Sequence, residues 1–584
     1  LSQVIFAIAL CASLFATSCF ATDYYVDGMN GDDANSGISA DDAWKTITHA
    51  IDSIEVSEEK PAAICVSEGI YSPSTNGEAF PLMLGSHVSI EGEDPGLTIL
   101  DGEYLGGIIE SRDASNSTLS NLSVTRASFP AIYCPSCTFI ISGCHIVGNR
   151  GHSTAAGDLT FINCRITDNN NNSACIGGSL ISCLIQNNSA PIVISNGSIR
   201  DCLIEGNIGT IISTTDSTIE DTVIRSNMGD RILYLERYVA IFRRCVIESN
   251  IMDEPLFEWK GGGWWQTGVF VPQLLLEDCL IADNTSLGGS LIHTYDLIPT
   301  HRSFISDELN EDDENDRIVI RRCVIADNHG QRRSKGDDVV PLLGLCDSIR
   351  IQDSVFSDNS IKLDTHGDEW SGTPDWPYNV DHCCLETEAE GEGNFVADPL
   401  FVSGPFGDYY LSCVAAGQEA DSPCIDAGSM SAAEAGLASM ATRTDGVFDT
   451  GTLDIGYHYS ATPPTIDCEV SGEGQPLLPG GPLVASFRVE NAGLPIWVDI
   501  YAGFILPDGT ILLVTPNGFT TDFAPFIETV HLPAGYASDD ITVFDSLIPD
   551  GLPDGTYVFA AALSLTGSFR PIGDIAAMQF AIAN

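Results

Sequence analysis

A seven-residue phrase that recurs nine times between residues 143 and 359 constrains the fold more than any other feature of this chain. Its second residue is most often Cys, its fourth is a branched apolar residue or Phe, and its last is always Asn. The nine closing residues are Asn149, Asn169, Asn188, Asn207, Asn227, Asn250, Asn284, Asn328 and Asn359. Successive copies lie 19 or 20 residues apart at first, and the later spacings lengthen to as much as 44. A near-constant step that tolerates insertions is typical of a solenoid.

The phrase itself predicts a short strand followed by a turn. In the copy from Gly143 to Asn149, Cys144 and Ile146 alternate with more polar neighbours, which is the period of a strand with one face buried. We expect the closing Asn to take the left-handed backbone conformation and to hydrogen-bond its counterpart one coil away, as a stacked ladder. Short strands and Asn turns in a repeat of about 20 residues, without helical periodicity, favour a parallel β-helix over a leucine-rich repeat.

Two segments outside the repeat carry a family resemblance. The first runs from Tyr24-Tyr25-Val26-Asp27-Gly28 through Ala43-Trp44-Lys45-Thr46-Ile47, and the second from Asp398-Pro399-Leu400-Phe401 through Asp454-Ile455-Gly456. With the repeat, they resemble the right-handed parallel β-helix proteins of the pectin-lyase-like superfamily, in particular a secreted bacterial group. The resemblance covers about residues 23 to 458 and implies the fold. It implies no single activity, because lyases, hydrolases and adhesins share this scaffold.

The composition changes along the chain and suggests a division into parts. Residues 22–459 are assigned to the β-helix, whose open end would be covered by an amphipathic helix over Asp41–Ile54, with Trp44, Ile47 and Ile51 on one face. Residues 460–465 form a Pro-containing linker. Residues 466–584 contain short alternating apolar runs between Gly, Pro and Asp turns, which predicts a smaller immunoglobulin-like β-sandwich.

The N-terminal segment and the charge bear on location and partners. Residues 1–21 are apolar and uncharged, which predicts a secretory signal peptide; lipid attachment at Cys19 is the alternative. No later apolar run is long enough for a transmembrane segment. With 25 Lys and Arg against 81 Asp and Glu, the net charge of −56 excludes an ordinary nucleic-acid-binding protein. We therefore expect a secreted or cell-surface protein.

The 19 cysteines divide into two groups. Seven occupy the second position of the repeated phrase and are expected to stack as free, buried thiols: Cys144, Cys164, Cys183, Cys202, Cys245, Cys279 and Cys323. Outside this column, Cys413 and Cys424 are the expected disulfide pair. Cys134 and Cys137 match half of a zinc knuckle, but a turn holding a bridge or two packed thiols fits the sequence better.

One Gly-rich loop is a candidate calcium site. It gathers the oxygen-bearing side chains Asp27, Asn30, Asp32, Asp33 and Asn35 within nine residues. The spacing is not that of an EF-hand, and a turn that holds no metal is the alternative. Calcium is the one cofactor that the sequence suggests.

Insertions after the later Asn residues gather aromatic and polar residues. If the coils stack in register, these insertions emerge from the same turn and build a wall along one side. Indole and phenol rings stack on sugar faces, so we predict a carbohydrate groove; packing of the loops onto the solenoid is the alternative. The candidate binding residues are Trp259, Trp264, Trp265, Trp370, Trp376 and Tyr378.

A catalytic set is harder to identify. A lyase of this superfamily needs a base and a cation, commonly Ca²⁺ on Asp side chains, and Lys260 and Lys335 are the candidate bases. A hydrolase needs paired carboxylates, and the signature elements of the polygalacturonases are missing. The sequence thus favours binding or adhesion toward a polysaccharide or cell-surface glycan, without an identifiable catalytic set. A Ca²⁺-dependent, pectate-lyase-like polysaccharide lyase is the alternative.

Overall fold

The structure is a computed structural model of the chain. It describes residues 21–583 except 112–113, 152–154, 172–173, 176, 190–191, 195–196, 215–216, 236–238, 261–272, 289, 296–317, 331–342, 345–348, 361–377 and 472–475. The expected signal peptide therefore lies almost entirely outside the described residues. Within them, no helix is long and apolar enough to cross a membrane.

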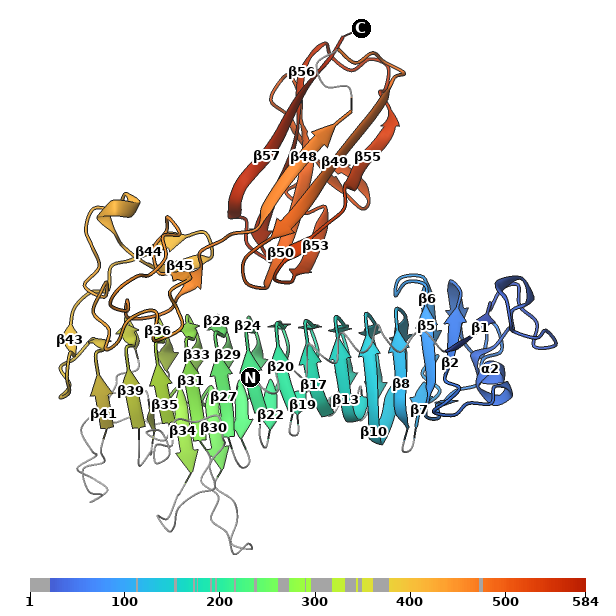
Figure 1. The fold of residues 1–584 in the computed structure, drawn as a ribbon, viewed down its shortest axis with the longest axis horizontal. Helices are drawn as coiled ribbons and strands as arrows, with labels where there is room; N and C mark the ends of the chain where they lie inside the picture. Colours follow the sequence, from blue (N-terminus) through green and yellow to red (C-terminus); the bar gives the residue numbers. More distant parts are fainter. Residues whose placement is uncertain are drawn as a thin grey trace, which may run out of the picture. The chain divides into compact units, whose positions relative to one another are not determined.

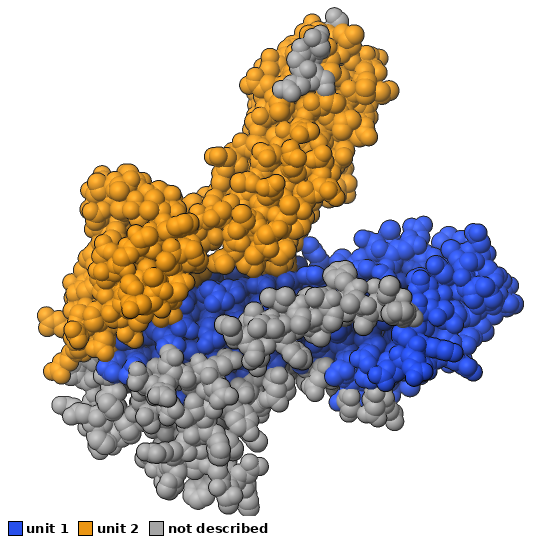
Figure 2. Space-filling view, viewed as in Figure 1, with its two compact units in different colours: residues 1–321, 325–351, 358–379 blue, residues 322–324, 352–357, 380–584 orange. Residues whose placement is uncertain are grey.

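The chain forms two compact units (Figure 2). Unit 1 contains residues 1–321, 325–351 and 358–379, and unit 2 contains residues 322–324, 352–357 and 380–584. Most coils of the β-helix belong to unit 1. The last coils, the tail that follows them and the β-sandwich belong to unit 2.

Parallel strands stacked coil upon coil make up the β-helix (Figure 1). Sheet 1 runs in the order β1 (Thr22–Val26), β2 (Ala62–Val66), β5 (Val88–Gly92), β8 (Ser115–Ser120), β10 (Ile132–Ser142), β13 (Ala155–Ile162), β17 (Gly177–Ile181), β20 (Gly197–Arg200), β23 (Ser217–Glu220), β27 (Val239–Arg243), β31 (Gln273–Glu277), β35 (Ile318–Arg321), β39 (Ile349–Gln352) and β41 (Tyr378–Asp381). Beside it, β4 (Leu82–Met83) pairs with β7 (Ile109–Glu110), which also pairs with β10.

The repeated phrase builds sheet 2. Its order is β3 (Gly69–Tyr71), β6 (Thr98–Asp101), β9 (Ser123–Thr125), β11 (His145–Val147), β14 (Arg165–Thr167), β18 (Leu184–Gln186), β21 (Leu203–Glu205), β24 (Val223–Arg225), β28 (Val246–Glu248), β32 (Leu280–Ala282), β36 (Val324–Ala326), β40 (Val355–Ser357), β42 (Cys384–Leu385) and β43 (Phe395–Val396). The strand of each copy pairs in register with the strand of the next, as Leu203 does with Val223. The expected parallel β-helix is confirmed.

Two shorter stacks complete the coils. Sheet 3 contains β16 (Ala174–Cys175), β19 (Ile192–Ile194), β22 (Ile212–Thr214), β26 (Leu233–Leu235), β30 (Phe257–Lys260), β34 (Ile292–Tyr295) and β38 (Leu343–Gly344). Sheet 4 contains β25 (Met228–Gly229), β29 (Ile251–Met252), β33 (Thr285–Ser286) and β37 (His329–Gly330), and β12 (Arg150–Gly151) pairs with β15 (Asn170–Asn171).

The repeated Asn column forms the expected ladder. Asn207 is typical: its Nδ2 donates to Oδ1 of Asn227 at 3.1 Å and to the carbonyl of Ile185 at 2.9 Å. The backbone N–H of Asn207 donates to the same Oδ1 of Asn227 at 2.9 Å. Each amide is buried and satisfied, so the ladder fixes one turn of every coil without an orphaned polar group.

One detail of that turn differs from the expectation. The left-handed residue is not the Asn but the residue before it, for example Asp168 with φ 56° and Asn187 with φ 55°. A second left-handed residue precedes the Cys position, as at Asp201 with φ 54°. The two left-handed residues bend the chain into and out of sheet 2, and the Asn is free to point its amide inward.

Ion pairs link successive coils on the outer face of sheet 1. Arg200 pairs with Glu220 at 2.9 Å, Arg243 contacts Glu220 at 3.4 Å and Glu277 at 2.9 Å, and Arg321 contacts Glu277 at 2.7 Å. Charges of alternating sign thus follow one column through five strands, β20, β23, β27, β31 and β35. Three of the 25 basic residues are thus used in this column to join coils.

The N-terminal helix is shorter than expected. Only Ile47–Ser53 is helical (α2), preceded by a single 3-10 turn over Ala40–Asp42 (η1). The carboxylate of Asp33 accepts the backbone N–H groups of Lys45 and Thr46, both at 2.9 Å, and Thr46 is the N-cap. These bonds hold the chain extended until residue 46, so the helix starts there. Its residues Ile47 and Ala50 are buried, in line with a capping role.

The cysteines follow the expectation in the repeat and depart from it elsewhere. The seven thiols of the column are buried and form no disulfide. Cys134 and Cys137 form a disulfide within β10, which agrees with a bridged turn and leaves no thiol there for zinc. The expected Cys413–Cys424 bridge is wrong: both are free thiols, and Cys424 instead hydrogen-bonds Cys384 of β42.

After the last coil, the chain forms a tail of short hairpins. β44 (Phe401–Gly404) pairs with β45 (Gly407–Leu411), and η3 (Val414–Ala416) follows them. β46 (Met440–Ala441) pairs with β47 (Tyr459–Ser460). The Tyr410 and Tyr459 rings stack with centroids 3.9 Å apart, which joins the two hairpins.

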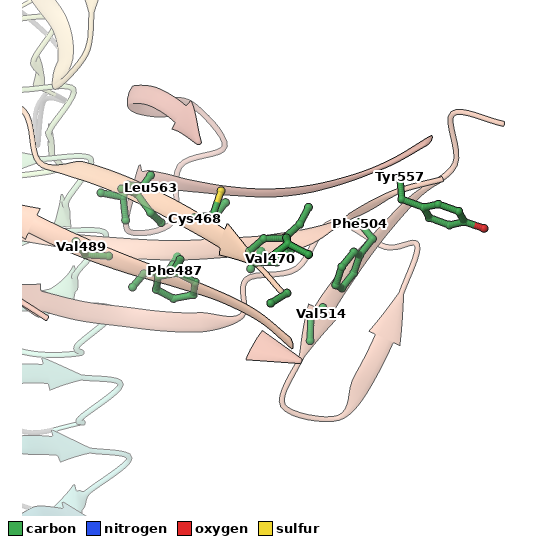
Figure 3. Close-up of a cluster of buried hydrophobic side chains, with 14 of the residues drawn as sticks. Cys468, Val470, Phe487, Val489, Phe504, Val514, Tyr557 and Leu563 are labelled. Atoms are coloured by element: carbon green, nitrogen blue, oxygen red, sulfur yellow. The ribbon is translucent and has the colours of Figure 1, made fainter. Parts of the chain in front are cut away.

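The C-terminal sandwich consists of two antiparallel sheets around an apolar core (Figure 3). One contains β48 (Thr465–Val470), β49 (Pro482–Asn491), β54 (Tyr536–Ala537) and β55 (Ile541–Leu547). The other contains β50 (Ile496–Ile505), β51 (Ile511–Thr515), β52 (Gly518–Thr520), β53 (Ile527–Leu532), β56 (Gly555–Leu565) and β57 (Pro571–Ile582). Cys468, Phe487, Phe504 and Leu563 meet in the core, and β49 buries every second residue, as sheet periodicity requires.

Candidate functional site

The outer face of sheet 3 carries a column of polar and aromatic side chains. Phe257 of β30 points into the β-helix, where it is fully buried and its ring meets Phe242 edge-on at 5.5 Å. The next residue, Glu258, therefore faces outward. Register pairs Glu258 with Tyr234 on one neighbouring coil and with His293 on the other. The three residues form one column over consecutive coils, which are about 4.8 Å apart.

An arginine from the preceding turn completes this cluster. Nη1 of Arg231 lies 2.7 Å from Oε2 of Glu258, and the guanidinium sits 5.2 Å from the centre of the Tyr234 ring. The side chains of Arg231 and Glu258 are 18% and 5% exposed. We call Arg231, Tyr234, Glu258 and His293 the sheet 3 cluster.

The Arg231–Glu258 contact leaves hydrogen-bonding capacity unused. Nε of Arg231 and Oε2 of Glu258 are buried and, despite their opposite charges, make no well-aligned hydrogen bond in the described structure. A buried donor or acceptor without a partner costs about 1–3 kcal/mol. Because both atoms are shielded from solvent, a sugar hydroxyl recovers that free energy only after these side chains turn outward.

Burial lowers the pKa of His293 below its ordinary value, and the carboxylates of Glu258 and Glu254 oppose this shift. The imidazole is therefore favoured in its neutral form at pH 7, with one nitrogen that donates and one that accepts. The cluster offers a cation, a carboxylate, a neutral imidazole and a phenol within adjacent coils. Such groups can bind vicinal hydroxyls, and the imidazole can also accept a proton.

Most of the binding residues expected from the sequence lie outside the described residues. This holds for Trp264, Trp265, Trp370, Trp376 and the candidate base Lys335. Trp259 and Lys260 are the last two residues of β30, and Tyr378 is the first of β41. The side chains of these three residues are likewise not described.

The insertions do not all leave the same turn, as the flanking strands show. Residues 261–272 join β30 to β31, and residues 296–317 join β34 to β35, so both belong to the corner between sheets 3 and 1. Residues 331–342 join β37 to β38, which is the corner between sheets 4 and 3. The expectation of a common wall was wrong because it counted from Asn alone and did not include the short strands of sheets 3 and 4.

The candidate calcium loop uses its oxygens internally. Asp27 accepts hydrogen bonds from the backbone of Met29 and Asn30 and from the side chain of Asn30, at 2.8 to 3.0 Å. Asp33 accepts from Lys45 and Thr46. Asp32 caps a turn at Ala34, and Asn35 donates to the carbonyl of Ala43 at 2.9 Å.

The internal hydrogen bonds give this loop a structural role in the absence of a metal. Within the described residues, no three His, Cys, Asp or Glu side chains are placed to hold a metal ion. Calcium at Asp27, Asn30, Asp32, Asp33 and Asn35 remains a prediction.

Sequence reasoning missed three members of the cluster, Arg231, Tyr234 and Glu258. Arg231 and Tyr234 lie in a coil without a long insertion, so nothing marked them. His293 falls in the stretch after Asn284 that the sequence assigns to an insertion, whereas it lies inside β34. Aligning the coils on the apolar residues of sheet 3 would have put Tyr234, Glu258 and His293 in one column.

Part of the chain matches a known protein family. Residues 29–234 match a family model described as a protein of unknown function, DUF1565. No curated protein matches the chain. The stacked parallel sheets define the chain as a right-handed parallel β-helix protein, extended by a β-sandwich.

Three solved structures to which the chain is similar are a pectate lyase, an epimerase module and a glucanase. Pectate lyase Pel9A is 13% identical, with 76% of this chain and 98% of that chain covered and a TM-score of 0.31. The A-module of the mannuronan C-5 epimerase AlgE4 from Azotobacter vinelandii is 14% identical, with 46% and 87% covered and a TM-score of 0.30. The catalytic unit of an alpha-1,3-glucanase from Streptomyces thermodiastaticus is 12% identical, with 58% and 64% covered and a TM-score of 0.27.

Proposed function

We propose that this protein is secreted or displayed at the cell surface, where it binds polysaccharide on the outer face of sheet 3. The observation that carries the proposal is the Arg231–Glu258 pair, buried yet deficient in hydrogen bonds, between Tyr234 and His293. Sugar hydroxyls are both donors and acceptors, so they match a guanidinium, a carboxylate and an imidazole together. The Tyr234 ring adds an apolar surface for the sugar C–H groups.

The charge of the protein selects among polysaccharides. A chain with a net charge of −56 repels polyanions at close range, although salt screens this repulsion beyond about 10 Å. A neutral polymer meets no such barrier. A polyuronate would need a bridging cation such as Ca²⁺.

Binding is tested with the full chain by affinity electrophoresis in gels that contain single polysaccharides. Glu258→Gln and His293→Ala are expected to weaken retardation by about tenfold, since each removes one or two hydrogen bonds to the ligand. Glu205→Gln is the matched control, because Glu205 pairs with Arg225 in the same way on sheet 2. Equal retardation of all four proteins would contradict the site, and the Trp264→Ala/Trp265→Ala variant tests the neighbouring insertion.

A Ca²⁺-dependent lyase is the second candidate, and one observation favours it. The neutral imidazole of His293 next to Glu258 is a possible proton acceptor, in addition to Lys260 and Lys335. Incubation with polyuronates and Ca²⁺ tests it through the ultraviolet absorbance of unsaturated products. A signal that is lost in His293→Ala, Lys260→Ala or Lys335→Ala supports the lyase; no signal from the parent protein contradicts it.

A further inference from the structure

A second surface, on the β-sandwich, has the features of a sugar-binding platform. In β50, Ile500 and Ala502 point into the core, so Tyr501 between them lies on the opposite face of the strand, where it is only 7% exposed. The Phe523 ring stacks on Tyr501 with centroids 4.7 Å apart and planes 29° apart. The Phe569 ring meets Phe523 edge-on at 5.4 Å. We call these three residues the aromatic platform.

The two outer rings of the platform are exposed. Phe523 is 61% and Phe569 is 73% exposed, although the sandwich has a well-formed core elsewhere. Burying apolar surface is worth about 25 cal/mol per Å². A ligand that covered these two adjacent phenyl rings would therefore gain binding free energy.

A buried carboxylate holds the loops that carry these rings. Asp499, two residues before Tyr501 on the same strand and 4% exposed, accepts the N–H of Thr529 at Oδ1, 2.8 Å away. Its Oδ2 accepts the N–H of Gly567 at 2.9 Å. One side chain thus holds Thr529 in the middle of β53, six residues after Phe523, and Gly567, two residues before Phe569. The platform is ordered before any ligand arrives, which lowers the entropic cost of binding.

The platform is anchored to the tail as well. Arg570, next to Phe569, donates to Oδ1 of Asp408 at 2.7 Å, and Phe406 packs against the sandwich core. Both residues lie at the β44–β45 hairpin within unit 2. The guanidinium at the edge of the platform is therefore already paired.

Charge decides which ligand fits. Residues 466–584 contain 14 Asp and Glu residues but only two Arg and no Lys. This balance disfavours nucleic acid, anionic lipid and uronate polymers. Aromatic side chains stack on the C–H faces of sugar rings without any need for charge.

We propose that the aromatic platform, through the exposed Phe523 and Phe569 rings with Tyr501 packed beneath Phe523, binds a neutral polysaccharide, as a carbohydrate-binding module attached to the β-helix. The ligand class is shared with the proposed function, and the inference rests on it to that extent. The two sites are separable, because one lies in unit 1 and the other in unit 2.

The test measures retention of the full chain on insoluble neutral polysaccharides, cellulose and a β-1,3-glucan, with soluble polygalacturonate as the anionic comparison. The Phe523→Ala/Phe569→Ala variant is expected to lose at least tenfold in affinity for a neutral polymer. Leu547→Ala is the matched control, since Leu547 is also 61% exposed but belongs to the other sheet. It should bind like the parent protein.

Glu258→Gln separates this site from the sheet 3 cluster. Retained binding in that variant, with loss in the double Phe variant, supports the platform even if the sheet 3 cluster binds nothing. Failure of the parent protein to bind any neutral polymer, or unchanged binding by the double variant, overturns the platform. Size-exclusion chromatography gives a further outcome: a double variant that only abolishes self-association makes the surface an interface between copies and overturns the proposal too.

Discussion

Glu277 of β31 accepts a hydrogen bond from Nε of Arg321 on the next coil at 2.7 Å, while its other oxygen lies 2.9 Å from Nε of Arg243 on the coil before. The carboxylate is 13% exposed and joins three coils. Glu277→Gln removes its charge but keeps its shape, and it removes the carboxylate that Arg243 and Arg321 share. We expect unit 1 to lose about 1–3 kcal/mol of unfolding free energy.

Urea unfolding followed by circular dichroism measures this loss. Glu59→Gln makes the same chemical change at an exposed position of unit 1 and should change stability by less than about 0.5 kcal/mol. Equal effects of the two substitutions would mean that the ion-pair column contributes nothing.

The Asn ladder predicts a larger effect. Asn227 accepts two hydrogen bonds from Asn207 at Oδ1, and its Nδ2 donates to Ile204 and to Asn250. Asn227→Ala leaves all of these buried partners without their hydrogen bond to residue 227. We therefore expect a loss of about 3–5 kcal/mol of unfolding free energy. Asn170→Ala, at the exposed position after the ladder, should cost less than about 1 kcal/mol. Thermal unfolding compares the two, and a similar melting temperature for both variants would rule out the ladder as a main stabilising element.

The fold could be predicted from the sequence because every copy of the repeat shows the same pattern of a short strand followed by a turn. Each Asn and each Cys of the repeat marks one coil, and the spacing between copies can be read from the sequence without knowledge of tertiary contacts. The left-handed residues could not be assigned so simply, because Asp168 and its equivalents differ from copy to copy and only the backbone geometry is shared. The helix start at Thr46 depended on Asp33, which lies 13 residues earlier in the chain.

The sheet 3 cluster was hidden for a related reason. Tyr234, Glu258 and His293 are neighbours only when the coils are stacked, and they are separated by 24 and 35 residues in the sequence. Insertions of different length lie between them, so a fixed period does not connect them. The prediction relied on aromatic residues in the insertions instead, because the composition of a segment can be read without knowing the register of the strands.

Asp201 predicts how stability depends on pH. Burial raises the pKa of its carboxyl to about 6, with the nearby Asp221 contributing in the same direction. An acid whose pKa is raised on folding prefers to stay protonated in the folded state. Its contribution is therefore favourable at low pH and is lost as the pH rises from about 4 through about 6.

Asp201→Asn removes this penalty, because Asn is neutral at every pH and tolerates the left-handed backbone at this position, φ 54°. We expect the variant to be more stable than the parent at pH 7.5 by about 1–2 kcal/mol and to match it near pH 4. Asp168→Asn is the control, since Asp168 is exposed and also left-handed. A stability gain for Asp201→Asn that is the same at both pH values would contradict a raised pKa.

The contact between Cys384 and Cys424 predicts where a disulfide forms under oxidising conditions. Both side chains are buried, Cys384 in the last coils and Cys424 in the tail, and their sulfurs share a hydrogen bond. That bond lowers the pKa of Cys384 and raises the pKa of Cys424, so Cys384 is the thiol that ionises first. Its thiolate attacks glutathione disulfide and releases one glutathione; Cys424 then displaces the second, and the two thiols have lost two electrons and two protons.

Refolding the reduced protein in a glutathione redox buffer, followed by peptide mapping without reduction, reads out the linkage. We expect a Cys384–Cys424 peptide, absent in Cys384→Ser, while the buried column that includes Cys183 stays reduced. The bridge closes a loop of about 40 residues and should raise the unfolding free energy of unit 2 by about 3–4 kcal/mol. A Cys413–Cys424 peptide in its place would show that the tail takes a different arrangement in solution.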